Sequence, residues 1–209
     1  MNDFFIRCRH MLLGWGFVGL IYSLGAAWPA TPTLLHDTAI DRLVPFDSGG
    51  IWVYLSFFAL VAGSFLSLPL ERLPRFTRSF QIAALIAGVV FLLMPTRLVY
   101  PDVYSGHVSA AVLRFLMQFD SAQNCLPSLH AALTLLCVVA QIDAARPIRS
   151  AWFAAWGVAM LHAILQTRRH LAIDIAAGLL VGIVALWLAA RIESKREARQ
   201  GLLTPGVPS

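Results

Sequence analysis

Long apolar runs separated by short polar breaks dominate this chain. Six of them approach the length of a membrane-spanning helix, which is about 20 apolar residues within a range of about 17–25. They lie at 11–30, 51–70, 80–97, 126–144, 151–167 and 171–190. The pattern predicts one all-α, polytopic membrane bundle of about six transmembrane helices. The bundle is expected to fill residues 1–200 and to be followed by a disordered tail at 201–209.

Basic residues at the ends of the runs predict the orientation, because short loops rich in Lys and Arg stay in the cytoplasm. Of the 16 basic residues, all but Arg42, Arg97, Arg114, Arg168 and Arg169 fall on the side of the two termini. Both termini are therefore expected in the cytoplasm. The first run has a second interpretation, since Gly25-Ala26-Ala27 resembles a signal-peptide cleavage site. Its removal would leave five spans with the other loops on the same sides.

Composition narrows the class of protein. Of the 209 residues, 58% are hydrophobic and 13% are charged, whereas soluble proteins carry about 25% charged residues. The net charge of +5 comes from basic residues that interrupt apolar runs, unlike the basic surface of a nucleic-acid-binding protein. We expect the bilayer as a partner and no nucleic acid. The spacings of the three cysteines do not suggest a zinc site, and no cofactor or metal is expected.

Two other patterns concern the loops and the packing. Residues 108–119, in a long outer loop, have the apolar face of a short amphipathic helix lying on the membrane surface. Such a helix could guide a lipid, or the loop could simply pack on the bundle. Gly178 and Gly182 form a G-x-x-x-G pattern on the last run, which favours close helix packing within the bundle.

Chemically distinctive residues fall at the ends of four runs. Because spans alternate in direction, all four ends reach the outer side, and one shared pocket is predicted there. Its candidates are Arg97, Ser128, His130, Arg168, Arg169, His170 and Asp174.

These residue types favour chemistry on phosphate. On a helix, the spacing of His170 and Asp174 places both side chains on one face, so the carboxylate can hold one imidazole nitrogen and leave the other free to attack. His130 can donate a proton to a leaving oxygen. Arginine side chains match phosphate oxygens. Pro127 suits the first turn of a helix whose free backbone N–H groups at 128–130 can hold an anion.

Two stretches resemble motifs of the type-2 phosphatidic acid phosphatase superfamily. Residues 127–130, Pro-Ser-Leu-His, are similar to the family's Pro-Ser-Gly-His. Residues 167–174, Thr-Arg-Arg-His-Leu-Ala-Ile-Asp, are similar to its last motif, which ends His-x-x-x-Asp. Leu129 replaces the usual glycine, and Ile164 stands where the family has an arginine six residues before the histidine. The first motif is absent, and Arg97 is its closest substitute.

With these departures from the usual pattern, the motifs resemble those of the branch that contains inositol phosphorylceramide synthases and their bacterial relatives. The resemblance covers residues 97–174 and implies a reaction without a metal. It implies His170 as nucleophile, Asp174 as its orienting carboxylate and His130 as acid and base. Phosphate binding would fall to Ser128, Arg168 and Arg97. Arg169 stays unassigned, and His162 is expected to be a packed or hydrogen-bonded core histidine.

The expected activity is hydrolysis of a lipid phosphomonoester or pyrophosphate through a phosphohistidine. The site would face the periplasm from a cell inner membrane. A lipid headgroup phosphotransferase similar to inositol phosphorylceramide synthase fits the same motifs, because only the acceptor differs. Alternatives from other classes are a haem carrier ligated by His130 and His170, and a membrane transporter or non-catalytic scaffold.

Overall fold

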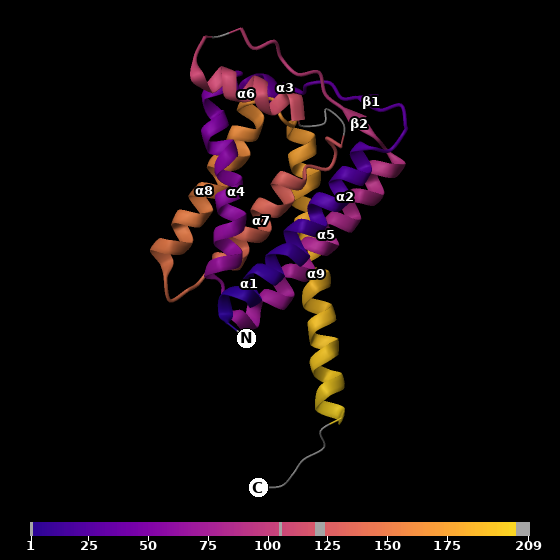
Figure 1. The fold of residues 1–209 in the computed structure, drawn as a ribbon, viewed down its shortest axis with the longest axis vertical. Coiled ribbons are helices and arrows are strands. Elements are labelled where there is room, and N and C mark those ends of the chain that lie inside the picture. The colour runs from indigo at the N-terminus through magenta and orange to yellow at the C-terminus, as the bar shows by residue number, and fades with distance from the viewer. Residues whose placement is uncertain (1, 105, 120–123, 204–209) are drawn as a thin grey trace.

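Five helices are long and apolar enough to cross a membrane in the computed structural model, which describes residues 2–104, 106–119 and 124–203. They span Asp3–Ala26, Ser48–Ser67, Leu70–Leu93, Pro147–Gln166 and Ala172–Arg199. They correspond to five of the six apolar runs and lie roughly along the long axis of the molecule (Figure 1). The prediction of a mostly helical membrane protein is therefore confirmed.

The elements of these spans start at the polar breaks of the sequence. The first span comprises α1 (Asp3–Met11), the π-helical turn η1 (Leu12–Gly16) and α2 (Phe17–Ala26). The next two are η2 (Ser48–Gly50) with α4 (Ile51–Ser67), and η3 (Leu70–Arg72) with α5 (Leu73–Leu93). The last two are α8 (Pro147–Gln166) and α9 (Ala172–Leu203). α5 and α8 each carry a proline in the first turn, where its missing N–H costs no helical hydrogen bond.

The fourth run, 126–144, forms a shorter helix than the others. α7 (Leu129–Gln141) has 13 residues and rises about 20 Å, less than the hydrocarbon core of about 30 Å. It packs against α4, α5, α8 and α9, and most of its side chains are buried. The structure thus has α7 as a central helix surrounded by longer ones (Figure 1). Among the described residues, five helices are therefore candidate spans, and the fourth apolar run forms a shorter apolar helix.

Small residues bring α7 and α9 together. A Cβ atom on Gly178 would collide with the backbone carbonyl oxygen of Ser128, and one on Gly182 would lie 3.1 Å from the carbonyl oxygen of Ala132. The G-x-x-x-G pattern is therefore used inside the bundle, where it lets two backbones approach closely. This contact sets the position of the start of α7 against the start of α9.

Short elements cap the bundle at one end. β1 (Thr33–Leu34) pairs in parallel with β2 (Thr96–Arg97), and α3 (Ala39–Leu43) follows β1 in the first loop. α6 (Val108–Phe119) coincides with the predicted amphipathic helix. It lies across this end of the bundle (Figure 1), packs on η2 and α4, and buries Ala110 and Leu113. The loop thus forms a helix that also packs on the bundle.

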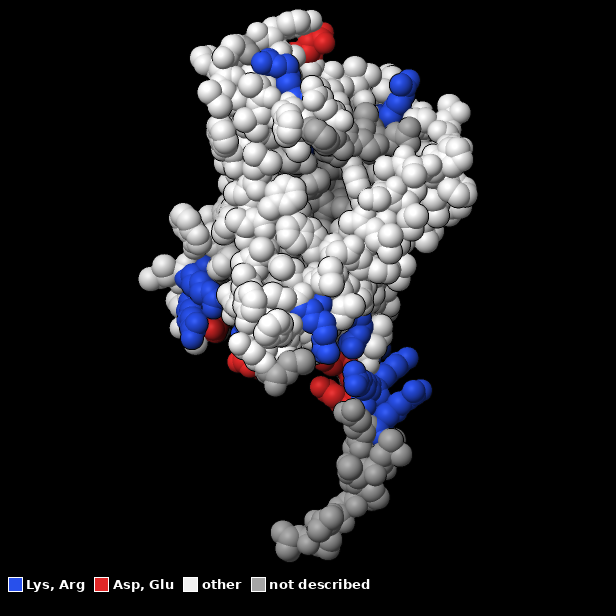
Figure 2. Space-filling model, in the orientation of Figure 1, with Lys and Arg blue, Asp and Glu red and all other residues white. Residues whose placement is uncertain are grey.

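The start of α1 and the end of α9 lie at the opposite end of the molecule from α3 and α6 (Figure 1). Most of the Lys and Arg side chains visible in Figure 2 gather at the terminal end. This distribution agrees with the loop charges used to predict orientation, and the cytoplasmic location of the termini stays a prediction. α9 continues to Leu203, into the range expected to be disordered, and residues 204–209 lie outside the described part.

Candidate active site

His170 and Asp174 come together at the junction between α8 and α9. The His170 Nδ1 atom lies 3.6 Å from the Asp174 Oδ2 atom. The same oxygen accepts a hydrogen bond of 2.9 Å from the backbone N–H of Leu171. Asp174 is fully buried and His170 is 7% exposed. The carboxylate is therefore shielded from water and placed to hold one imidazole nitrogen.

The pairing differs in one respect from the prediction. His170 lies in the turn before α9, and only Asp174 belongs to the first turn of the helix. The carboxylate thus caps the start of α9 by accepting the Leu171 N–H while it faces His170. The two residues approach each other through this capping arrangement rather than by standing on one helical face.

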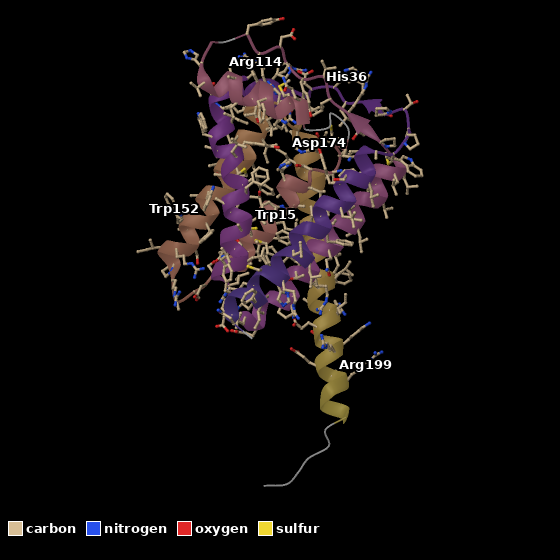
Figure 3. All side chains as sticks on the ribbon, in the orientation of Figure 1. Trp15, His36, Arg114, Trp152, Asp174 and Arg199 are labelled. Carbon is tan, nitrogen blue, oxygen red and sulfur yellow. The ribbon has the colours of Figure 1, made fainter. Side chains whose placement is uncertain are left out.

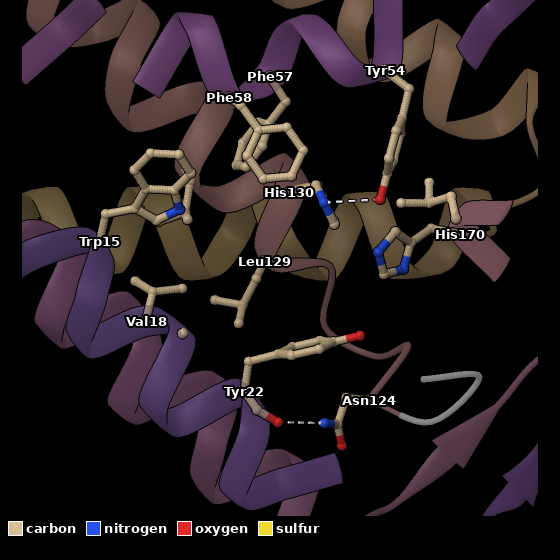
Figure 4. A pocket seen from close by; sticks show the side chains of 13 residues that line it. Trp15, Val18, Tyr22, Tyr54, Phe57, Phe58, Asn124, Leu129, His130 and His170 are labelled. Carbon is tan, nitrogen blue, oxygen red and sulfur yellow. Dashed lines mark hydrogen bonds between the residues drawn. The ribbon is translucent and has the colours of Figure 1, made fainter. Parts of the chain in front are cut away.

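His130 faces the same space from the first turn of α7. Its ring centroid is 5.6 Å from that of His170, and its Nε2 atom lies 3.0 Å from the Tyr54 hydroxyl oxygen. The Phe57 ring packs beside it, with centroids 4.8 Å apart. The structure therefore brings the two predicted histidines together, and it adds Tyr54 from α4 as a residue that orients His130 (Figure 4).

Ser128 connects the two motifs. Its backbone N–H donates a hydrogen bond of 2.9 Å to the carbonyl oxygen of Asp174. Its hydroxyl oxygen accepts the Ala131 N–H at 3.3 Å and so caps α7. The fully buried Ser128 therefore fixes the distance between the starts of α7 and α9.

Arg168 supports the turn between α8 and α9. Its guanidinium donates hydrogen bonds of 2.8 Å to the carbonyl oxygens of Asp41 and Val44. Its backbone has a φ of 54°, which is uncommon for a residue other than glycine. The two bonds to the first loop hold Arg168 in this conformation.

The other two arginines point elsewhere. The Arg169 guanidinium is buried and lies 4.1 Å from the centre of the Tyr100 ring, a cation–π contact. Arg97 is exposed, and its chain neighbours Thr96 and Leu98 are buried. Among the described residues that line the cavity beside the histidines there is no arginine.

Asp41 is a site-supporting residue that the sequence analysis did not single out. Its Oδ1 atom accepts the N–H of Ala172, the first residue of α9, at 2.7 Å. Its Oδ2 atom accepts both the N–H and the hydroxyl of Thr38, each at 2.7 Å. The sequence signal was the capping box formed by Thr38 and Asp41.

The surroundings of Asp41 also affect its ionisation. Burial by itself would raise the pKa of this carboxyl, but hydrogen bonds from Thr38 and Ala172 lower the pKa below its ordinary value. The positive charge of Arg168 acts in the same direction. Asp41 is therefore a buried carboxylate that clamps the first loop onto the start of α9.

A largely apolar cavity of about 290 Å³ opens from the two histidines into the bundle. Its walls come from η1, α2, α4, α6 and α7, and aromatic side chains dominate them (Figure 4). Asp174 lies near the capped end of the bundle, whereas Trp15 lies near the middle of its length (Figure 3). The cavity thus joins a polar, histidine-containing end to an apolar interior.

Other expected site features can also be located. His162 is exposed on α8, so the prediction of a packed core histidine is wrong. Among the described residues, no group of three or more His, Cys, Asp or Glu side chains is placed to hold a metal ion.

Comparison with known proteins identifies the family. The family model described as the PAP2 superfamily matches residues 50–188. The matched range includes α4, both histidine-containing motifs and most of α9, and it covers more than half of the chain. No curated protein and no solved structure matches. The match over this share of the chain, together with the convergence of the two motifs, shows that the protein belongs to the PAP2 superfamily.

Proposed function

We propose that the protein is an integral-membrane phosphatase that hydrolyses a phosphomonoester or pyrophosphate of a lipid. Membership of the PAP2 superfamily supports phosphoric ester hydrolysis at a coarse level. The observation that carries the proposal is the pair His130 and His170 at one end of an apolar cavity in a membrane bundle. Such a cavity suits a substrate with a phosphate at one end and hydrocarbon at the other.

The first step is a nucleophilic displacement at phosphorus. The His170 nitrogen that faces away from Asp174 forms a bond to phosphorus while the bond to the leaving oxygen breaks. Asp174, 3.6 Å from Nδ1, stabilises the positive charge that the imidazole gains. His130 gives its proton to the leaving oxygen. The products are a phosphohistidine and a lipid alcohol, or a lipid monophosphate if the substrate is a pyrophosphate.

The second step returns the enzyme to its starting state. His130, now neutral, takes a proton from water as the water oxygen bonds to phosphorus. The bond between phosphorus and His170 breaks, and inorganic phosphate leaves. The hydrogen bond between Tyr54 and His130 supports both steps because it restricts the orientation of the ring that moves the proton.

Phosphate binding is assigned to Ser128, Arg168 and Arg97, with a rearrangement. Arg168 has to release the carbonyl oxygens of Asp41 and Val44 before its guanidinium can reach a phosphate. The start of α7 offers a second set of donors, because the first N–H groups of a helix attract anions. Leu129 and His130, which begin that helix, both line the cavity.

Phosphoryl transfer to another alcohol is the second candidate. The apolar lining of the cavity favours it, because such a wall can hold a lipid alcohol as well as a lipid phosphate. The resemblance of residues 127–130 and 167–174 to the branch of inositol phosphorylceramide synthases supports this candidate. Only the acceptor in the second step would change.

We propose that both termini are cytoplasmic and that the site faces the periplasm from a cell inner membrane.

The test is phosphate release by the purified protein and by His170→Ala in detergent. The substrates are phosphatidate, phosphatidylglycerophosphate and undecaprenyl pyrophosphate. Release by the wild type that disappears in the variant supports the phosphatase and selects its substrate class. Without release from any of them, labelled lipid with added alcohols tests the transferase. Phosphate binding with neither reaction would instead favour a non-catalytic scaffold.

A further inference from the structure

The cavity is built as a slot with helical periodicity on three sides. Successive turns of the first span between Trp15 and Tyr22 face it, and α4 and α7 contribute side chains with the same helical spacing. The contributors are Trp15, Val18, Gly19 and Tyr22; Tyr54, Phe57 and Phe58; and Leu129, His130 and Leu133. The slot therefore follows the length of these helices away from the histidines.

An aromatic pair closes the far end of the slot. The ring centroids of Trp15 and Phe58 are 5.7 Å apart, and Figure 4 shows Trp15 on the side of the slot away from His170. Trp15 belongs to the π-helical turn η1. Such turns change the direction in which side chains leave a helix and are frequent at functional sites.

The slot is also open sideways. Figure 2 shows a hollow in this face of the molecule, and the described residues that surround it there are uncharged. Large apolar side chains of the neighbouring helices are exposed, including Leu20 and Leu24 on α2 and Trp52 on α4. In a bilayer these surfaces contact lipid, so a hydrocarbon chain can reach the slot without crossing water.

We propose that this slot binds the hydrocarbon chain of the lipid phosphate and that Trp15, packed on Phe58, limits the length of chain it accepts. The inference rests on the proposed function of the histidine pair. From Tyr22, beside the histidines, to Trp15 the helix rises about 10 Å. One leaflet of hydrocarbon is about 15 Å deep. A long chain therefore meets Trp15 before it is fully enclosed.

The first wall of the slot lies outside the range that matches the family model. Trp15, Val18 and Tyr22 precede residues 50–188, the range that matches the family model. The histidines and Phe58 lie inside that range, so the slot combines one wall outside the family match with walls inside it.

The test compares substrates that share one phosphate and differ only in chain length. Phosphate release is measured for alkyl monophosphates of graded length, at a constant fraction in detergent micelles, with wild type, Trp15→Ala and the control Trp152→Ala. Trp152 is an exposed tryptophan on α8 and does not line the slot. We expect Trp15→Ala to raise kcat/KM for long chains relative to short ones by about tenfold, since each additional buried methylene is worth about fourfold. Trp152→Ala should leave the ratio unchanged.

Two further measurements keep the proposal open to refutation. Phe58→Leu removes the partner ring with a smaller loss of volume. If Trp15→Ala does not fold, Phe58→Leu should shift the ratio of kcat/KM for long and short chains in the same direction.

Binding is followed separately by the quenching of tryptophan fluorescence with an alkyl phosphonate brominated near its chain end. The part of the quenching that unbrominated phosphonate displaces should disappear in Trp15→Phe and persist in Trp152→Phe.

The outcomes separate the inference from the proposed function. Hydrolysis with an unchanged chain-length ratio in both slot variants overturns the chain limit and leaves the phosphatase intact. Failure of the wild type to release phosphate from any lipid phosphate overturns the proposed function. In that case the quenching experiment by itself tests whether the slot binds a hydrocarbon chain. Displaceable quenching that depends on Trp15 supports chain binding, and the absence of such quenching overturns it.

Discussion

The two histidines of the cavity have unlike surroundings. His170 lies in a turn, faces the buried carboxylate of Asp174, and is supported by the first loop through Asp41. His130 lies on a helix, contacts the neutral hydroxyl of Tyr54, and packs on Phe57. A nearby carboxylate stabilises a positive imidazole, whereas a phenol restricts the ring without adding a charge. The difference suits His170 to bonding with phosphorus and His130 to moving protons.

The largest effect is expected from removing the nucleophile. His170→Ala should reduce kcat by at least about 10⁴-fold, because the proposed phosphohistidine cannot form without the imidazole that bonds to phosphorus. A base-stable, acid-labile phosphoprotein should form in the wild type and be absent from the variant, as measured by rapid quenching with labelled substrate. His162→Ala is the matched control, since His162 is exposed on α8. Near-normal turnover by His170→Ala would remove the nucleophile assignment.

Removing the acid should have an effect that depends on the leaving group. With an alkyl phosphate, His130→Ala should lose about 10²–10⁴-fold in kcat, the usual contribution of general acid–base catalysis. With a nitrophenyl phosphate the leaving oxygen needs no proton, so phosphohistidine formation should be much less affected. Equal losses with both substrates would mean that His130 does not act as the acid.

Asp41 holds the first loop against the start of α9, next to the turn that carries His170. Its contribution can be tested by measuring the stability of the protein. Asp41→Asn should lower the free energy of unfolding by about 1–3 kcal/mol, because a buried, charge-assisted set of hydrogen bonds is weakened. The exposed Asp37→Asn provides the control. Thermal unfolding in detergent measures both.

The same substitution has a predicted pH dependence. The pKa of Asp41 is lowered in the folded protein. The ionised carboxylate therefore contributes fully to the free energy of unfolding above the ordinary carboxyl pKa of about 4. This contribution declines as the pH falls through the lower pKa of the folded state. The difference between wild type and Asp41→Asn should therefore be constant near neutral pH and shrink below about pH 4. A difference that grows on acidification would contradict the assignment.

The smallest effect is expected from changing Tyr54, whose hydroxyl contacts His130. Tyr54→Phe removes one hydroxyl and should lower kcat by about tenfold, equivalent to about 1.4 kcal/mol, the net value of one hydrogen bond. The pH profile of kcat should also shift, because the hydroxyl that contacts the proton-transferring ring is removed. A merely structural role would lower stability without moving the profile. Tyr104→Phe, at an 88% exposed position, should change neither.

Several features of the protein could be predicted from local patterns in the sequence. Five of the six apolar runs became candidate spans because their length and composition match the bilayer. The amphipathic pattern at 108–119 became α6 with the predicted bounds. The convergence of His130, His170 and Asp174 followed from alternating helix direction, which requires no knowledge of side-chain contacts.

Tertiary structure decided what the local patterns could not. A partner that lies far away in the sequence, such as Tyr54 for His130 or Asp41 for Ala172, leaves no periodic signal. Whether Arg168 reaches phosphate or backbone carbonyl oxygens depends on where the first loop lies. The length of α7 and the exposure of His162 depend on packing among neighbouring helices. The sequence by itself determined the membrane class and the candidate reactive residues, because hydrophobicity and side-chain chemistry are local properties. Only the fold decided the orientation of those residues and the shape of the cavity, because both arise from contacts between distant segments.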